Sequence, residues 1–237
     1  MKARNFQSFI SANVSCLLDP QLCPGCQHAL HNRQIFCESC QQRLGTIRHP
    51  CHLCGLENQN TDDICAACLY DPPRWQRIIA PLQYQGLTRE LIMQFKFSQS
   101  LHFASSLIQS IAHHFPGDSA KPDALLPIPL HHNRLMERGY NQAFEISRLL
   151  SRQTNIPVDT RTLFRVRDTE AQAGLTARGR EKNILKAFSF HNRNHYRHVA
   201  VIDDIVTTGS TANEVTKTLH RAGVETVEIW SLARVCR

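Results

Sequence analysis

Residues 199–211 hold the side chains of this sequence that are best suited to chemistry on a small molecule. A compact apolar run, 199–202, predicts a buried strand that delivers Asp203 and Asp204 to its carboxyl end. A short loop and then a helix follow, and loop amides, hydroxyls and a helix N-terminus together suit a phosphate group. Gly209 would let the backbone approach such a ligand closely. The other loop residues of this predicted site are Thr207, Thr208, Ser210 and Thr211.

The two adjacent carboxylates would be repelled by that phosphate, so we expect them to contact the neutral hydroxyls of a sugar. The pattern therefore favours a sugar phosphate as the ligand. A Walker A loop is excluded because the segment contains no Gly-Lys-Ser/Thr. The plainer alternative is an acidic turn that caps an ordinary helix.

Eight of the ten cysteines form four Cys-x-x-Cys pairs, which begin at residues 23, 37, 51 and 65, a constant shift of 14. Tetrahedral zinc needs four thiolates, and two such pairs supply them. The equal spacing leaves interleaved or nested combinations of the pairs open. The simplest assignment gives one zinc to Cys23, Cys26, Cys37 and Cys40 and a second zinc to Cys51, Cys54, Cys65 and Cys68.

Zinc is favoured over disulfides because the first residues do not form a convincing signal peptide, which predicts a reducing, cytoplasmic location. Four tandem pairs also differ from the single pair of a thioredoxin-type redox motif. A module of this size has few large apolar side chains, so bound metal must supply much of its folding free energy. Four thiolates leave no open coordination position, which predicts a structural rather than a catalytic role for zinc.

Length and charge narrow the class of protein. The chain has 237 residues, 42% of them hydrophobic, and a formal net charge of +7. Residues 134–197 carry 13 basic and six acidic residues, so this segment alone contributes 13 − 6 = +7. Such a segment favours a phosphate-bearing partner, with a solvated surface as the alternative. No uncharged apolar run approaches the roughly 18–20 residues that would span a bilayer.

Alternating strands and helices are expected after residue 76, which predicts an α/β fold with a mainly parallel sheet flanked by helices. We expect three parts: an amphipathic docking helix over 1–22, a small double zinc ribbon over 23–70, and the α/β domain over 76–237. The expected strands are 78–84, 124–130, 199–202 and 224–232. The expected helices are 88–97, 101–114, 141–154 and 212–222, the last of them capped by Gly223.

Residues 199–211 resemble the phosphoribosyl-pyrophosphate signature of type I phosphoribosyltransferases. Three further features are the cysteine pairs, the motif Arg-x-x-x-Arg-Gly-Tyr-Asn-Gln at 134–142 and a motif over 172–188. With all of these features, the chain resembles the ComF/GntX family along essentially its whole length. This resemblance implies a type I phosphoribosyltransferase-like fold. It also implies a link to natural competence and to the uptake and use of DNA.

The resemblance assigns roles to residues of the predicted site. It places Asp203 and Asp204 on the ribose hydroxyls and Mg²⁺ between the pyrophosphate and ribose oxygens. The loop residues Thr207, Thr208, Gly209, Ser210 and Thr211 would hold the 5′-phosphate. Positive charge for the pyrophosphate would come from Arg134 and Arg138. A basic loop over 165–186 could close over the site and add Arg165, Arg167, Arg178, Arg180 and Lys182, and the equal alternative is a loop that meets solvent or a DNA backbone.

Two classes of function remain open from the sequence. In the first, the chain is a transferase that attaches phosphoribose to an acceptor that the sequence does not identify. In the second, it is a non-catalytic module that binds single-stranded DNA or a protein of the competence machinery. The sugar-phosphate site would then sense a metabolite or contact a nucleotide.

Overall fold

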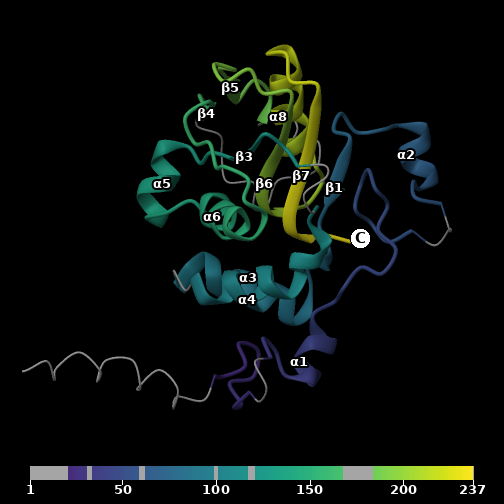
Figure 1. Ribbon diagram of the computed structural model, residues 1–237, viewed down its shortest axis with the longest axis vertical. Coiled ribbons are helices and arrows are strands. Elements are labelled where there is room, and N and C mark those ends of the chain that lie inside the picture. The colour runs from purple at the N-terminus through teal and green to yellow at the C-terminus, as the bar shows by residue number, and fades with distance from the viewer. Residues whose placement is uncertain are drawn as a thin grey trace, which may run out of the picture.

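The computed structural model describes residues 21–30, 34–58, 62–98, 101–116, 121–167 and 184–236. Its centre is a parallel sheet with the strand order β1-β7-β6-β3, and β2 also pairs with β7 (Figure 1). The strands of this sheet are β1 (Arg77–Ile79), β2 (Leu82–Gln83), β3 (Ala124–Pro127), β6 (His198–Val206) and β7 (Thr226–Arg234).

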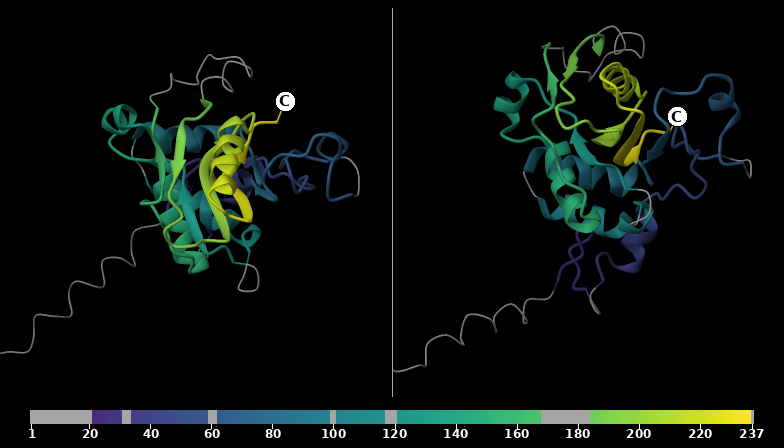
Figure 2. Two further views of the ribbon diagram at one scale, coloured as in Figure 1. Left: turned by 90° about the horizontal axis from the view of Figure 1, so that it is seen from above. Right: turned by 45° about the horizontal axis from the view of Figure 1, so that its top comes forward.

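Both faces of the sheet are buried, and alternate residues of a strand enter different cores. In β6, Ala200 and Ile202 pack into one core, whereas Val199 and Val201 pack into the other. The first core lies under three helices: α3 (Gly86–Ser98), α4 (Leu101–Ile111) and α6 (Gln142–Thr154). The second lies under α8 (Ser210–Arg221) and the antiparallel pair β4 (Leu163–Arg165) and β5 (Phe188–Phe190), as the two views of Figure 2 show.

The remaining elements of the described ranges are short. They are α1 (Glu38–Arg43), α2 (Ala66–Tyr70), the 3₁₀ helix Ala112–His114 and α5 (His132–Arg138). Helix α1 lies beneath α3 and α4, whereas α2 lies beside β1 at another side of the molecule (Figure 1). The two halves of the cysteine-rich segment therefore support different parts of the fold.

The predicted mainly parallel sheet flanked by helices is confirmed, and so are its main helices. The single strand expected over 78–84 is wrong, because β1 and β2 are separated by Ala80 and Pro81. Proline has no backbone N–H for a ladder. The carbonyl of Pro81 instead accepts a hydrogen bond of 2.8 Å from the backbone N–H of Ile47, in the segment that joins the two cysteine sites.

The boundaries of several elements differ from the expected ones. Strand β6 continues to Val206, so Asp203 and Asp204 lie within its last residues rather than after its end. Helix α8 begins two residues earlier than expected, at Ser210, and Gly223 follows it with a φ of 89°. None of the helices in the described ranges is long and apolar enough to cross a membrane. The docking helix expected over 1–22 lies almost wholly outside the described residues, and the domain boundaries stay predictions.

Candidate functional site

A pocket of about 330 Å³ lies where β6 ends and the loop to α8 begins. Parallel strands of open α/β sheets bind ligands at this edge. The pocket is formed by strand β6, the loop before α8, the start of α8, the region after β3, α5, the start of α6, Arg165 of β4 and Lys96 of α3. Most of the residues singled out in the sequence are therefore brought to one cavity.

The acidic side of the pocket consists of Asp203 and Asp204. A carboxylate oxygen of Asp204 lies 2.8 Å from the ammonium nitrogen of Lys96, and both side chains are largely buried. Asp203 accepts a hydrogen bond of 2.9 Å from the backbone N–H of Asp204. Burial and then the neighbouring charge of Asp204 raise the pKa of Asp203 well above its usual value, although Lys96 opposes this shift.

The loop side of the pocket is built around Gly209. This residue has a φ of 80° and is the N-cap of α8. A Cβ atom added there would lie 2.9 Å from Cη2 of Trp75, so glycine is required by conformation and by space. The hydroxyls of Thr208 and Ser210 lie 2.8 Å apart, which ties the loop to the first turn of the helix.

Basic side chains also line the pocket. Arg134 and Arg138 of α5 line it, and Arg138 donates a hydrogen bond of 3.1 Å to Gln142 Oε1. The start of α6 is fixed by Asn141, whose side chain donates to the carbonyl of Ile128 at 3.0 Å. The pocket can therefore hold a ligand that carries both hydroxyls and anionic oxygens.

The residues predicted from the sequence divide into three groups. The pocket is lined by Asp203, Asp204, Thr207, Gly209, Ser210, Thr211, Arg134, Arg138 and Arg165. Thr208 does not itself line the pocket, but its hydroxyl lies 2.8 Å from that of Ser210, which does. Arg167 is among the described residues but does not line the pocket either. Arg178, Arg180 and Lys182 lie outside the described residues.

Lys96, Asn141 and Gln142 also line the pocket but were not among the predicted site residues. The sequence does contain a signal for Lys96. This lysine comes directly after Phe95, which lies with Leu91 on the buried side of α3.

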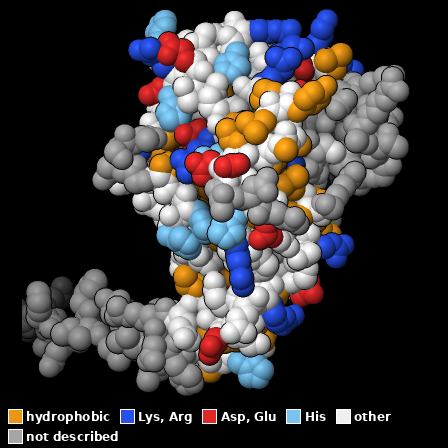
Figure 3. Space-filling model, turned by 90° about the vertical axis from the view of Figure 1, so that its right-hand side faces the viewer, with side chains coloured by type: hydrophobic (Ala, Val, Ile, Leu, Met, Phe, Trp, Pro, Cys, Tyr) orange, Lys and Arg blue, Asp and Glu red, His pale blue; other side chains and the backbone are white. Residues whose placement is uncertain are grey.

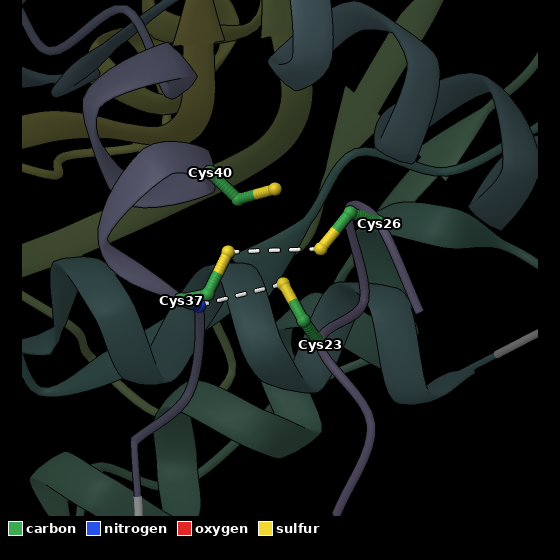
Figure 4. Close-up of side chains that lie close together, drawn as sticks. All are labelled: Cys23, Cys26, Cys37 and Cys40. Carbon is green, nitrogen blue, oxygen red and sulfur yellow. Dashed lines mark hydrogen bonds between the residues drawn. The ribbon is translucent and has the colours of Figure 1, made fainter. Parts of the chain in front are cut away.

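The first cysteine site consists of Cys23, Cys26, Cys37 and Cys40, whose sulfurs lie within 4.8 Å of one another. Figure 4 shows the four side chains pointing toward a common centre, with Cys40 coming from α1. The sulfurs of Cys26 and Cys37 are 3.6 Å apart. Tetrahedral zinc with bonds of about 2.3 Å separates sulfurs by about 3.8 Å, so the residues present fit this metal.

The second cysteine site repeats this geometry with Cys51, Cys54, Cys65 and Cys68. The sulfurs of Cys54 and Cys65 lie 3.8 Å apart. In both sites the third cysteine is the N-cap of a short helix, and its N–H points at the sulfur of the first cysteine. The sulfurs are thus grouped sequentially along the chain rather than in an interleaved or nested way.

Hydrogen bonds prepare one thiol of each site for deprotonation. Burial raises the pKa of the Cys23 and Cys51 thiols, but N–H donors led by Cys37 and Cys65 outweigh it and lower these pKa values to about 6 and about 7. Burial raises the pKa of Cys54 to about 11. Metal binding must therefore displace protons from some of the thiols.

Fold and sites together define an α/β protein with a polar pocket at its strand ends and two four-cysteine sites that could hold structural zinc. Competence protein F from Haemophilus influenzae is 36% identical over 223 residues, which cover 90% of this chain and 96% of that protein. DNA utilization protein YhgH from Escherichia coli (strain K12) is 33% identical over 204 residues, 84% of this chain and 90% of that one. Competence protein ComFC from Bacillus subtilis is 26% identical over 200 residues, with coverages of 79% and 78%. The chain belongs to the ComF family of competence-protein homologues.

A scan against protein-family models finds no match. Among solved structures, adenine phosphoribosyltransferase from Leishmania tarentolae aligns with a TM-score of 0.32 and 18% identity, covering 56% of this chain and 58% of that one. A purine phosphoribosyltransferase from Pyrococcus horikoshii Ot3 aligns with a TM-score of 0.33 and 15% identity, covering 59% and 85%. Alignments of this quality carry no argument about function.

Proposed function

We propose that the chain binds phosphoribosyl pyrophosphate with Mg²⁺ in this pocket and transfers the phosphoribosyl group to an acceptor during the use of imported DNA. The observation that carries the proposal is the composition of the pocket, in which an acid pair, a threonine-glycine loop and two arginines line one cavity. The names of the relatives, which refer to competence and DNA utilization, support the biological setting.

Each side of the pocket has a distinct role in this proposal. Asp203 and Asp204 accept hydrogen bonds from the ribose hydroxyls, which carry no charge to repel them. The loop over 207–211 and the N-terminus of α8 bind the 5′-phosphate through N–H groups and hydroxyls. Arg134 and Arg138 neutralise the pyrophosphate, because a guanidinium can bind two phosphate oxygens at once.

Mg²⁺ fits this site because carboxylate and hydroxyl oxygens are the donors it prefers, directly or through water. When bound, it would neutralise the pyrophosphate. Transfer breaks the bond between the anomeric carbon and a pyrophosphate oxygen, which leaves with the electron pair, and joins that carbon to the acceptor. The chain contributes by positioning the sugar, neutralising the leaving group and excluding water.

The test is calorimetric titration of the zinc-loaded protein with phosphoribosyl pyrophosphate and Mg²⁺. We expect saturable binding that Asp203→Ala/Asp204→Ala abolishes. Glu225→Ala is the matched control, because this exposed carboxylate pairs with Arg197 outside the pocket and should leave binding intact. A folded wild type that does not bind the ligand would refute the proposal. Where binding holds, release of pyrophosphate with a panel of acceptors tests the transfer.

A non-catalytic DNA-binding or partner-binding module is the second candidate, and the basic segment 134–197 favours it. Binding of single-stranded DNA through Arg178, Arg180 and Lys182 would weaken steeply with added salt. Neutralising these three residues should then reduce the slope of log affinity against log salt. An unchanged slope would exclude them as the DNA contact.

A further inference from the structure

The second cysteine site is joined to the loop before α8 by two side chains. Backbone carbonyls of its first Cys-x-x-Cys turn accept both connections: Leu53 from the indole N–H of Trp75 at 2.6 Å, and Cys54 from Nε of Arg234 at 2.8 Å. Both side chains are buried, Trp75 with 6% and Arg234 with 8% of its surface exposed. Buried groups with fixed hydrogen bonds transmit a displacement rather than absorb it.

The far ends of the same two side chains contact the loop. Cη2 of Trp75 lies 2.9 Å from the position of a Cβ on Gly209, so the indole lies against the loop backbone. One terminal nitrogen of Arg234 donates to the carbonyl of Val206 at 3.0 Å and also to the carbonyl of Thr207. Arg234 thus connects Cys54 to the start of the loop, and Trp75 connects Leu53 to its glycine.

The first cysteine site has different neighbours, although its local geometry is the same. Cys23 and Cys40 belong to the core that α3 and α4 cover. A Cβ on Gly25 would lie 3.0 Å from the side chain of Leu87 in α3. Figure 1 places α1 beneath these helices, whereas the connections to the loop before α8 come from the second site.

We propose that the second cysteine site positions the loop over 207–211, so that metal at this site, and not at the first, sets the order of the loop and through it the affinity of the pocket for its ligand. Arg234 and Trp75 are the positioning residues. The proposal rests on the proposed function for the identity of the ligand, but the order of the loop can be measured without any ligand.

The mechanism follows from which atoms the metal holds. Four ligands fix the turn over 51–54, and with it the two carbonyls that receive Trp75 and Arg234. When the turn loosens, the guanidinium of Arg234 loses an acceptor in a buried place. Because an unsatisfied buried donor is costly, Arg234 must then move, and the carbonyls of the loop lose their donor.

The internal repeat provides a matched pair of variants. Cys65→Ser removes a ligand from the second site, and Cys37→Ser removes the equivalent ligand from the first. Both residues are N-caps, of α2 and α1, and serine is a preferred N-cap, so neither substitution removes the start of its helix. Amide hydrogen exchange of residues 207–211 is measured without ligand, and affinity for phosphoribosyl pyrophosphate with Mg²⁺ is measured by calorimetry.

We expect Cys65→Ser to accelerate exchange of the loop amides and to weaken binding by at least about fivefold, the lower end of typical coupling between linked sites. Cys37→Ser should change exchange of the loop amides by no more than about twofold. Because the first site packs against α3, which carries Lys96 of the pocket, any effect of this variant on affinity should come without faster loop exchange. Equal effects of the two variants on the loop, or no effect of Cys65→Ser, would overturn the proposal. If the wild type does not bind the ligand at all, the proposed function fails, and exchange of the loop amides alone decides the inference.

Arg234→Lys covers the case in which Cys65→Ser fails to fold. It retains both cysteine sites and the positive charge but loses the forked contacts to Cys54, Val206 and Thr207. We expect unchanged zinc content, faster exchange of the loop amides and weaker binding. In a folded Cys65→Ser protein, adding Arg234→Lys should bring little further loss, because residues on one path are not additive. Unchanged loop exchange in Arg234→Lys, or full additivity in the double variant, would count against the proposal.

Discussion

Gly209→Ala tests how rigidly Trp75 and the loop are held together. A left-handed backbone costs a residue with a Cβ roughly 1–2 kcal/mol, and Gly209 has a φ of 80°. The new Cβ would also lie 2.9 Å from Cη2 of Trp75. Because the indole is buried and bonded to Leu53, it cannot turn away freely, and overpacking of this kind costs typically about 1–3 kcal/mol.

The two contributions together predict a loss of about 2–5 kcal/mol in the free energy of unfolding. For a chain of this length, each kcal/mol lowers the Tm by roughly 2–4 °C, so the expected decrease is about 4–20 °C. Gly223→Ala is the control, because Gly223 has a φ of 89° but open space around its Cβ position. This variant should lose only about 1–2 kcal/mol.

Thermal unfolding of the two zinc-loaded variants measures the contribution of Trp75 as a difference. A second check is the double variant Gly209→Ala/Trp75→Phe, in which the phenyl ring lacks the atom that clashes. We expect the double variant to be more stable than the sum of the two single effects predicts. The reasoning is refuted if Gly209→Ala loses no more stability than Gly223→Ala. Trp75 would then move freely and could not position the loop.

Asp203→Asn should raise the Tm at neutral pH, because burial and Asp204 raise the pKa of Asp203 and so disfavour its ionised form in the folded state. The same substitution should abolish ligand binding. The gain should shrink as the pH falls through the folded pKa toward the ordinary Asp value; a lower Tm at neutral pH would contradict the assignment. Lys96→Met should destabilise the protein by less than the roughly 3–5 kcal/mol of a fully buried pair, since Lys96 and Asp204 keep 19% and 14% exposure. Arg197→Ala, at an exposed pair, should leave the Tm unchanged; equal thermal shifts for the two variants would refute the ranking. A chelator should release two Zn²⁺ per chain and lower the Tm, as a chromogenic zinc assay and a melting curve can show; release of one ion or none would contradict the assignment of both sites.

The parts of the site that could be predicted from the sequence are those encoded in short stretches of chain. Residues 199–211 contain a strand, a loop and the start of a helix, so their geometry follows from local rules. The cysteine pairs are also local, and neighbouring pairs proved to share a site. Pro81 indicates that the strand expected over 78–84 is interrupted, because proline cannot donate a backbone hydrogen bond inside a sheet.

The contacts that could not be predicted join distant parts of the chain. Lys96 reaches Asp204 from α3, and Arg234 reaches Cys54 across 180 positions of sequence. Neither contact follows from periodicity, because both depend on how helices and strands pack. The cysteine repeat shows the same limit. Its two units are alike in spacing and in local geometry, yet one packs under α3 and the other is joined to the loop before α8 through Trp75 and Arg234.

The acid pair also bears on the choice between the two proposed functions. An internal nucleotide of DNA has no 2′-hydroxyl and no free 3′-hydroxyl, and its phosphodiester is negative. Asp203 and Asp204 would therefore find no hydroxyl donors on a DNA backbone in the pocket, whereas they suit the free diol of a ribose. Any DNA must bind elsewhere, and Figure 3 shows basic side chains gathered along the upper edge of one face. Saturating phosphoribosyl pyrophosphate should then leave the affinity for a single-stranded oligonucleotide unchanged. Competition between the two ligands would mean that the carboxylates are not aimed at a ribose.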